Sequence, residues 1–282
     1  MRPRTPERLF RDCERHLRQQ PVEGYMGTRK SEAGDSVQAT RTMFEIVECL
    51  RDAEDLTVTE IADRTGYAKS TVHRHLGTLT DLEYVTEAAG RYNVGLRFLE
   101  LGQRARTRCE GYELAREKVE EIAEQTGERA QFLVKEHGKA VYIHRAFGER
   151  AVHTDPGIGS RVPLHATSAG KAILAEIDEE ELFEVVEQAA FDPITDWTIT
   201  DPDELLAELE QIRDDGYSFN RQENLEGLHA VGAAVTAADG GVIGALSVSG
   251  PSYRLTDEWF EEELPTLLMG ATNELELNIA HA

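Results

Sequence analysis

The sequence predicts an α+β protein with an N-terminal winged helix-turn-helix domain, a linker helix, and a C-terminal domain built on an antiparallel sheet. Three observations lead to this prediction. The chain has 282 residues, enough for two domains of ordinary size. Helical spacing of apolar residues over 36–80 is followed by a short hairpin pattern. In the second half, two further hairpin patterns are separated by amphipathic helical patterns.

Composition indicates a folded chain without membrane segments. Apolar residues make up 40% of the sequence and charged residues 29%, so the chain can bury a core and is not disordered throughout. It contains no run of about 18 apolar residues, the length needed to span a membrane. Arginines interrupt the N-terminal segment where a signal peptide would require an apolar stretch. We therefore expect a cytoplasmic protein with no membrane partner.

The charge balance is strongly acidic. There are 53 acidic and 30 basic residues, only six of them lysines, and the net charge is −23. Carboxylates hold hydration, and a large net charge keeps a protein dispersed in multimolar salt. This composition favours a halophilic prokaryote, and within the prokaryotes an archaeon. An ordinary acidic cytosolic protein is the alternative.

The acidic residues are unevenly distributed. Residues 105–282 carry 36 acidic and 14 basic residues, whereas the seventeen residues from Arg64 to Thr80 include no acidic one. Nucleic-acid phosphates require cations where they touch the protein, so the local charge matters more than the total. The acid-free segment is therefore a candidate surface for a polyanion.

Three helices are predicted at the start of the first domain. Ser36 is a good N-cap for the first helix, and apolar positions recur behind it at helical spacing: Val37, Thr40, Met43, Phe44, Val47 and Leu50. Thr57 or Thr59 caps the second helix, and Gly66 ends it. The third helix opens near residues 68–70 and buries Val72, Leu76 and Leu79. Two helices joined by a short turn that contains glycine are typical of a helix-turn-helix.

The outer face of the third helix carries residue types suited to DNA. Hydroxyl groups can contact phosphates or base edges, and arginine can bind guanine or phosphate through two hydrogen bonds. Residues 84–86 and 91–94 predict a hairpin, which would form a wing with Arg91 near the DNA backbone. A protein-docking module built from the same elements is the alternative. The predicted DNA-binding residues are Lys69, Ser70, Thr71, His73, Arg74, His75 and Arg91.

Residues 36–102 resemble the DNA-binding domain of the isocitrate-lyase-regulator (IclR) family of transcription factors. The family usually has proline where Ala68 stands; the alanine removes a rigid helix start and leaves the recognition face intact. The similarity is carried by Leu56-Thr57, Glu60-Ile61-Ala62, Gly66-Tyr67-Ala68-Lys69-Ser70-Thr71-Val72-His73-Arg74, Leu79, Tyr84-Val85, Tyr92-Asn93-Val94-Gly95 and Leu101-Gly102.

The second half predicts an antiparallel α+β domain. An amphipathic pattern that ends near Thr126 predicts the linker helix, and hairpin patterns over 131–146 and 231–249 flank three predicted helices. Residues 162–172 and 244–251 are similar to segments of the IclR effector-binding domain, which has a GAF-like fold. The predicted domains are an N-terminal extension (1–34), the winged helix-turn-helix domain (35–98), the linker helix (99–126) and the GAF-like effector-binding domain (127–282).

The extension of residues 1–34 matches nothing in the family. Met26 lies just before the start that is typical of its members. Either translation begins at Met26, or the extension is a basic arm that adds phosphate contacts.

Two features of the second domain suit a small anion. Ser168 and Ala169 begin a predicted helix, where free backbone N–H groups attract a carboxylate. Ser247 and Ser249 lie two apart on a predicted strand, so both hydroxyls point to one face; ordinary strand composition is the alternative. The resemblance implies effector contacts from Ser168, Ala169, Asn220, Leu228, Ala230, Ser247 and Ser249. The family often has aspartate at the position of Asn220 and cysteine at that of Ala230, which makes this site less acidic and roomier.

No catalytic, cofactor or metal site is predicted. Gly170-Lys171 lacks the flanking residues of a phosphate-binding loop, and no Gly-x-Ser-x-Gly pattern is present. The five residues that could contribute to a zinc site have no recognisable ligand spacing: His137, His144, His153, His165 and Asp155.

The resemblance implies a transcription regulator that binds an operator in double-stranded DNA as a homodimer, with a homotetramer as the larger assembly. A small metabolite, an organic or sugar acid, would modulate the operator affinity. The alternative is a ligand-sensing module or small-molecule enzyme whose helical domain docks protein.

Overall fold

A computed structural model describes residues 36–152, 157–189 and 191–282 of the chain. These residues divide into two compact units, one ending at Ala105 and the other beginning at Arg106. The expectations about residues 1–34, Met26, His153 and Asp155 lie outside the described residues.

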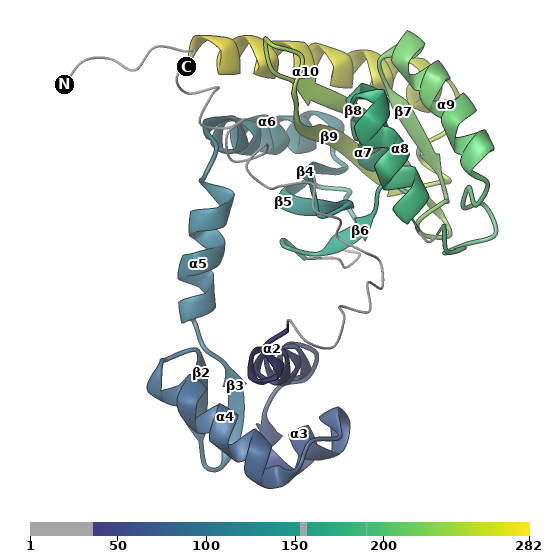
Figure 1. Cartoon of the computed structure of the whole chain (residues 1–282). Coiled ribbons are helices and arrows are strands. Elements are labelled where there is room, and N and C mark those ends of the chain that lie inside the picture. Colours follow the sequence, from purple (N-terminus) through teal and green to yellow (C-terminus); the bar gives the residue numbers. More distant parts are fainter. Residues whose placement is uncertain (1–35, 153–156, 190) are drawn as a thin grey trace. The chain divides into compact units, whose positions relative to one another are not determined.

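The first unit is a winged helix-turn-helix (Figure 1). Its elements are α2 (Gln38–Arg51), β1 (Leu56–Thr57), α3 (Val58–Thr65), α4 (Lys69–Asp81), β2 (Val85–Ala88) and β3 (Arg91–Val94), with the strands in the order β1-β3-β2. Thr57 caps α3 in a capping box with Glu60, and Gly66 ends that helix with a φ of +75°. The β2–β3 turn places Ala89 and Gly90 at positive φ, which matches the twist of a tight hairpin.

The start of the first helix differs from the prediction. Val37, not Ser36, precedes α2, and no side chain caps the helix. The buried face is formed by Thr42, Ile46, Val47 and Leu50, whereas Phe44 is 50% exposed. Apolar residues lie on two adjacent stripes of this helix, and packing against α3 selects only one of them for the core.

The expected linker helix is two helices. Helix α5 (Arg97–Arg106) buries no residue, and α6 (Glu110–Thr126) buries a full face in the core of the second unit. The chain is extended at residue 109 between them (φ −124°, ψ 131°). The amphipathic pattern therefore correctly predicted helix, but half of it belongs to the C-terminal core.

The second unit contains a six-stranded sheet with strand order β6-β5-β4-β9-β8-β7, in which all paired neighbours are antiparallel. The two central hairpins are β4 (Arg129–Glu136) with β5 (Lys139–Phe147), and β8 (Leu228–Thr236) with β9 (Val242–Pro251). The edges are β6 (Arg161–Pro163) and β7 (Ser218–Arg221), neither of which the apolar pattern revealed. Short edge strands bury few residues, so they carry little periodic signal.

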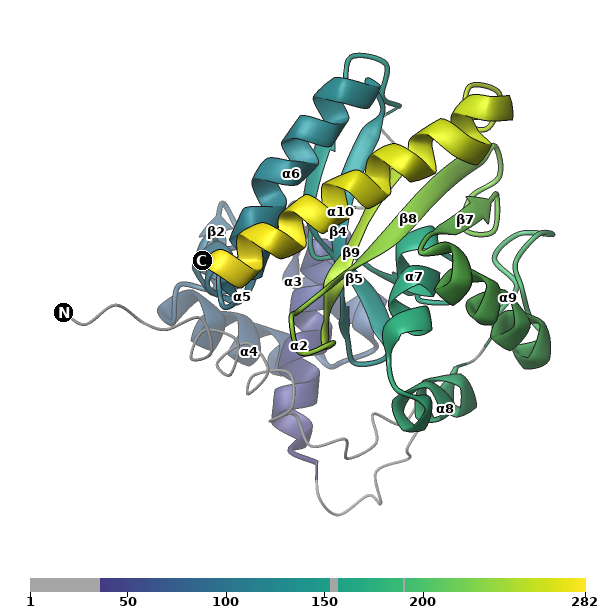
Figure 2. The same cartoon turned by 90° about the horizontal axis from the view of Figure 1, so that it is seen from above.

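Helices cover both faces of this sheet. Figure 2 shows α6 and α10 (Leu264–His281) side by side across one face, where they enclose a core with Phe132, Val231 and Leu246. On the other face, α7 (Ser168–Glu176) packs against the sheet at Leu133 and Ala245, and α9 (Pro202–Asp215) packs on α7. Helix α8 (Glu179–Gln188) buries only Leu182, and a π-helical turn over Trp259–Glu263 leads into α10. No helix of the described residues is long and apolar enough to cross a membrane.

His144 on β5 is a buried titratable group next to the end of α5. Its side chain is 2% exposed, and its Nδ1 lies 2.9 Å from Nη2 of Arg106. Burial and, as the next largest cause, the positive charge of Arg106 lower the pKa of His144 to about 4. The folded protein therefore holds this imidazole neutral.

Acid should destabilise the second unit through His144. Between about pH 6.5 and pH 4, His144 is protonated in the unfolded chain but remains neutral in the folded protein. The free energy of unfolding therefore falls as the pH falls through this range. His144→Gln should flatten this part of the curve of unfolding free energy against pH, measured by denaturant titration at constant salt. His281→Gln, at an exposed position on α10, is the matched control and should follow the parent protein. Parallel curves for His144→Gln and the parent would contradict the assignment.

Candidate functional site

Helix α4 presents the predicted DNA-contacting residues on its outer face. Val72, Leu76 and Leu79 anchor the inner face in the core of the first unit. Of the other side chains, Lys69, Ser70, His73 and Arg74 are exposed, and Thr71 and His75 are half-buried. No ion pair joins Lys69 or Arg74 to a carboxylate in the described ranges. Both cations are therefore available to a ligand outside the unit.

Arg91 on β3 has contacts within its own unit. Its Nη1 donates a hydrogen bond to the backbone oxygen of Asp55 and lies 3.8 Å from Oε2 of Glu60. Asn93 Nδ2 donates to Oδ1 of Asp55 at 2.8 Å. The half-exposed Arg91 thus joins the wing to the turn before α3, a role that its position in the sequence did not reveal.

The second unit contains a cavity of about 100 Å³ between α7 and the sheet. All seven residues that the family resemblance implied for the effector line it. They are Ser168, Ala169, Asn220, Leu228, Ala230, Ser247 and Ser249. The cavity is also lined by residues that the sequence reasoning missed: Arg129, Gln131, Leu133, Tyr142, Thr167, Asn224 and Leu225.

Strand register explains why these residues meet. Arg129 pairs with Ser249, and Gln131 with Ser247, across β4 and β9. Ser249 pairs in turn with Ala230, and Ala230 with Asn220. Because alternate residues of a strand share a face, all of these side chains project from one side of four neighbouring strands. The alternation Arg129-x-Gln131-x-Leu133 was visible in the sequence, but the predicted strand began only at residue 131.

The polar side chains of the cavity form a connected set. Arg129 Nε donates to Ser249 Oγ at 2.9 Å, and the hydroxyls of Ser168 and Ser247 lie 3.0 Å apart. Gln131 Nε2 lies 3.4 Å from both Ser247 Oγ and Ser249 Oγ. Burial lowers the pKa of Arg129, but an arginine stays protonated at any physiological pH. Among the described residues that line the cavity, Arg129 alone is charged.

Helix α7 reaches the sheet because β8 carries a glycine beneath it. A Cβ on Gly232 would lie 2.6 Å from both the nitrogen of Ala169 and the carbonyl carbon of Ser168. Thr167 caps the helix by accepting a hydrogen bond from Gly170 N at 3.1 Å. The N-terminus of α7 therefore forms one wall of the cavity.

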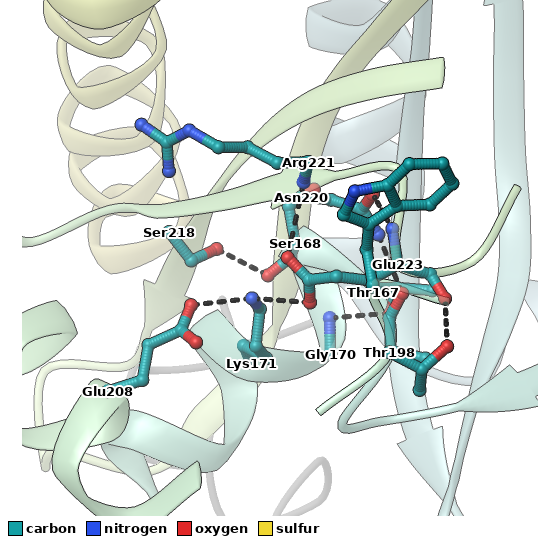
Figure 3. A network of polar contacts seen from close by, with 12 residues as sticks. Thr167, Ser168, Gly170, Lys171, Thr198, Glu208, Ser218, Asn220, Arg221 and Glu223 are labelled. Carbon is teal, nitrogen blue, oxygen red and sulfur yellow. Dashed lines mark hydrogen bonds and ion pairs between the residues drawn. The ribbon is translucent and has the colours of Figure 1, made fainter. Parts of the chain in front are cut away.

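A buried ion-pair network holds the segment that follows β7 (Figure 3). Lys171, fully buried on α7, donates to Glu208 Oε1 at 2.5 Å and to Glu223 Oε2 at 2.6 Å. Burial raises the pKa of Glu223, and the charge of Lys171 opposes this shift. The segment held by Glu223 continues into Asn224 and Leu225, which line the cavity.

Both ends of the Asn220 amide form hydrogen bonds within the protein. Its Nδ2 donates to the carbonyl of Ala166 at 2.6 Å, and its Oδ1 accepts from Glu223 N at 3.1 Å. It therefore connects β7 both to the loop before α7 and to the segment after β7 (Figure 3). Its amide positions the cavity wall, and because Asn220 also lines the cavity, the effector contact that the resemblance implies stays a prediction.

The part of the chain that the structure describes contains no candidate metal-binding site. No group of three or more His, Cys, Asp or Glu side chains is placed to hold a metal ion there.

A winged helix-turn-helix unit joined to a unit with a small polar cavity is the architecture of a ligand-responsive DNA-binding regulator. Residues 104–275 match the profile of the bacterial transcriptional regulator IclR C-terminal domain, and residues 43–89 match that of the IclR helix-turn-helix domain. The chain belongs to the IclR family of transcriptional regulators. It is a regulator with a C-terminal effector-binding domain and not an enzyme, so the enzyme alternative is wrong.

Individual relatives agree with this assignment. The chain is 29% identical to the "Probable HTH-type transcriptional regulator ArcR" of Halobacterium salinarum, over 84% of this chain and 92% of the relative. It is 32% identical to the HTH-type transcriptional regulator KdgR of Escherichia coli, over 83% of this chain and 89% of that protein. The crystal structure of the Thermotoga maritima IclR superposes with a TM-score of 0.74 at 29% identity, covering 86% of this chain and 98% of the other.

Gly232→Ala should open the contact between α7 and β8. The added methyl group meets backbone atoms that cannot rotate away, so overpacking of about 1–3 kcal/mol is expected. Gly270→Ala is the matched control, because a Cβ there meets nothing within 4 Å and the residue is exposed within α10. That control should stabilise the unit by about 0.5–1 kcal/mol through helix propensity. Denaturant unfolding of both variants measures the difference, and equal stabilities would contradict the role of Gly232.

Proposed function

We propose that this protein binds a pseudo-palindromic operator through α4 and that an organic or sugar acid in the α7 cavity changes its operator affinity. The observation that carries the DNA part is the exposed outer face of α4. Lys69 and Arg74 stand there, in a segment without acidic residues, although the chain as a whole has a net charge of −23. Such a face suits the major groove, where an arginine reads guanine and hydroxyls reach phosphates.

The effector part rests on the charge of the cavity. Arg129 brings a positive charge to its wall, and the N-terminus of α7 adds the positive end of a helix dipole. No carboxylate is among the described residues that line it. A buried cavity with this polarity favours an anion small enough to be enclosed, which supports an organic acid.

A homodimer, able to pair into a homotetramer, is the proposed assembly. Leu96, just before α5, and Leu99, in its first turn, are 83% and 66% exposed. Neighbouring exposed leucines favour association with a second apolar surface. A dimer would place one recognition helix in each half-site.

The domain limits of 35–98, 99–126 and 127–282 remain part of this proposal, as does adaptation to high salt. In about 1 M salt the Debye length is about 3 Å, so phosphate attraction is weak. Base-edge contacts would then contribute more of the operator affinity than they do at low salt.

Replacing Arg74 tests the recognition face. Arg74→Ala should weaken operator binding by about 1–3 kcal/mol, because it removes a base or phosphate contact, while effector binding persists. Fluorescence anisotropy with an operator selected from random DNA measures the loss. Arg116→Ala is the matched control, since Arg116 is a partly exposed arginine on α6 paired with Glu120. Equal operator affinity for Arg74→Ala and the parent would contradict the proposal that α4 is the helix that contacts the operator.

Replacing Arg129 tests the cavity. Arg129→Gln keeps a donor for Ser249 but removes the charge, so the affinity for an organic acid should fall about tenfold or more. Calorimetric titration with the acid that gives the largest thermal shift in a panel of organic and sugar acids measures this. Arg116→Gln should bind that acid as the parent does. An unchanged affinity for Arg129→Gln would place the anion elsewhere.

A further inference from the structure

The cavity contains a buried acceptor without a donor. Gln131 is 4% exposed, and its Oε1 has no hydrogen-bond partner among the described residues. Its Nε2 faces the hydroxyls of Ser247 and Ser249. A buried carbonyl oxygen left without a donor is costly, so a ligand that donates a hydrogen bond there gains affinity.

Gln131, which carries the unpartnered acceptor, and Arg129, the cation of the cavity, are close neighbours. Arg129 and Gln131 are two residues apart on β4, so their side chains share a face. Both reach the same hydroxyl, since Ser249 Oγ lies 2.9 Å from Arg129 Nε and 3.4 Å from Gln131 Nε2. A ligand with its carboxylate and its hydrogen-bond donor on adjacent carbons can therefore meet both side chains.

The volume limits the rest of the ligand. A cavity of about 100 Å³ holds only a few carbon atoms. Apolar side chains also line the cavity, among them Leu133, Leu225, Leu228 and Ala230, and Arg129 is the one charged residue of its described lining. The remainder of the ligand is therefore a short alkyl group without a second charge.

We propose that the effector is a short 2-hydroxycarboxylate of two to four carbons, with its carboxylate on Arg129 and its hydroxyl donating to Gln131 Oε1. This inference rests on the proposed function and specifies the class of acid. A 2-oxo acid would present an acceptor to Oε1, and an unsubstituted acid would leave Oε1 without a donor. Both should bind less tightly than the hydroxy acid.

Three acids of equal carbon number test the selectivity of the intact protein. Calorimetric titration in high salt should show that one enantiomer of lactate binds at least about tenfold more tightly than pyruvate and propionate. Equal affinities for the three acids, a preference for pyruvate, or no binding of either lactate enantiomer would each overturn the proposal.

A variant assigns the selectivity to Gln131. Gln131→Met keeps the length of the side chain but removes both polar atoms, so the lactate-to-propionate affinity ratio should fall to near one while propionate binding is retained. Gln125→Met, at an exposed position on α6 outside the cavity, is the matched control and should keep the parent ratio. Thermal unfolding verifies that both variants are folded. A parent-like ratio in folded Gln131→Met overturns the assignment, as does a tenfold loss of propionate binding.

Operator binding separates this inference from the proposed function. If another acid changes the operator affinity of the parent through Arg129 while lactate does not, the hydroxy-acid inference fails and the proposed function stands. If no acid of the panel changes the operator affinity, the proposed function fails as well.

Discussion

The cavity of the second unit depends on the close approach of α7 to the sheet. Gly232 has no side chain at the point where the first residues of α7 cross β8, and the backbone of Ala169 occupies that space. On the far side of the helix, Lys171 reaches the carboxylates of Glu208 and Glu223. Removing a partner of a buried ion pair is strongly destabilising, so these contacts hold Lys171 in place. The helix is therefore held between a glycine contact and an ion-pair network, and the cavity lies at its N-terminus.

The cavity and the outer face of α4 are poor in acidic residues, unlike the rest of this acidic chain. The excess of carboxylates lies in residues 105–282, yet the described residues that line the cavity include no carboxylate and one arginine. The outer face of α4 likewise lacks acidic residues from Lys69 to Thr80, and Asp81 stands only at the end of the helix. An anionic surface maintains hydration and dispersion, whereas a surface that binds an anion must exclude like charge. Both places where a negatively charged ligand is proposed are free of acidic residues in the part of the chain that the structure describes.

Two amide side chains at the cavity, Asn220 and Gln131, differ in their hydrogen bonds to the protein. Asn220 and Gln131 both carry an amide at the cavity, but both ends of the Asn220 amide bond to the protein, whereas Gln131 Oε1 has no partner in the described ranges. The family resemblance pointed to Asn220 as a contact and gave no sign of Gln131. The hydrogen-bond partners that the fold supplies decide which amide oxygen is left without a donor.

Local pattern by itself determined much of this protein. Helical spacing, the threonine cap at Thr57 and Gly66 predicted α3 and α4, because those signals act within one or two turns. Tertiary structure decided the remainder. The break between α5 and α6, the choice of Ile46 over Phe44 for the core, and the meeting of Arg129 with Ser249 all depend on contacts between distant segments. Strand register brings such residues together, and the sequence of a single strand does not contain the register of its partner.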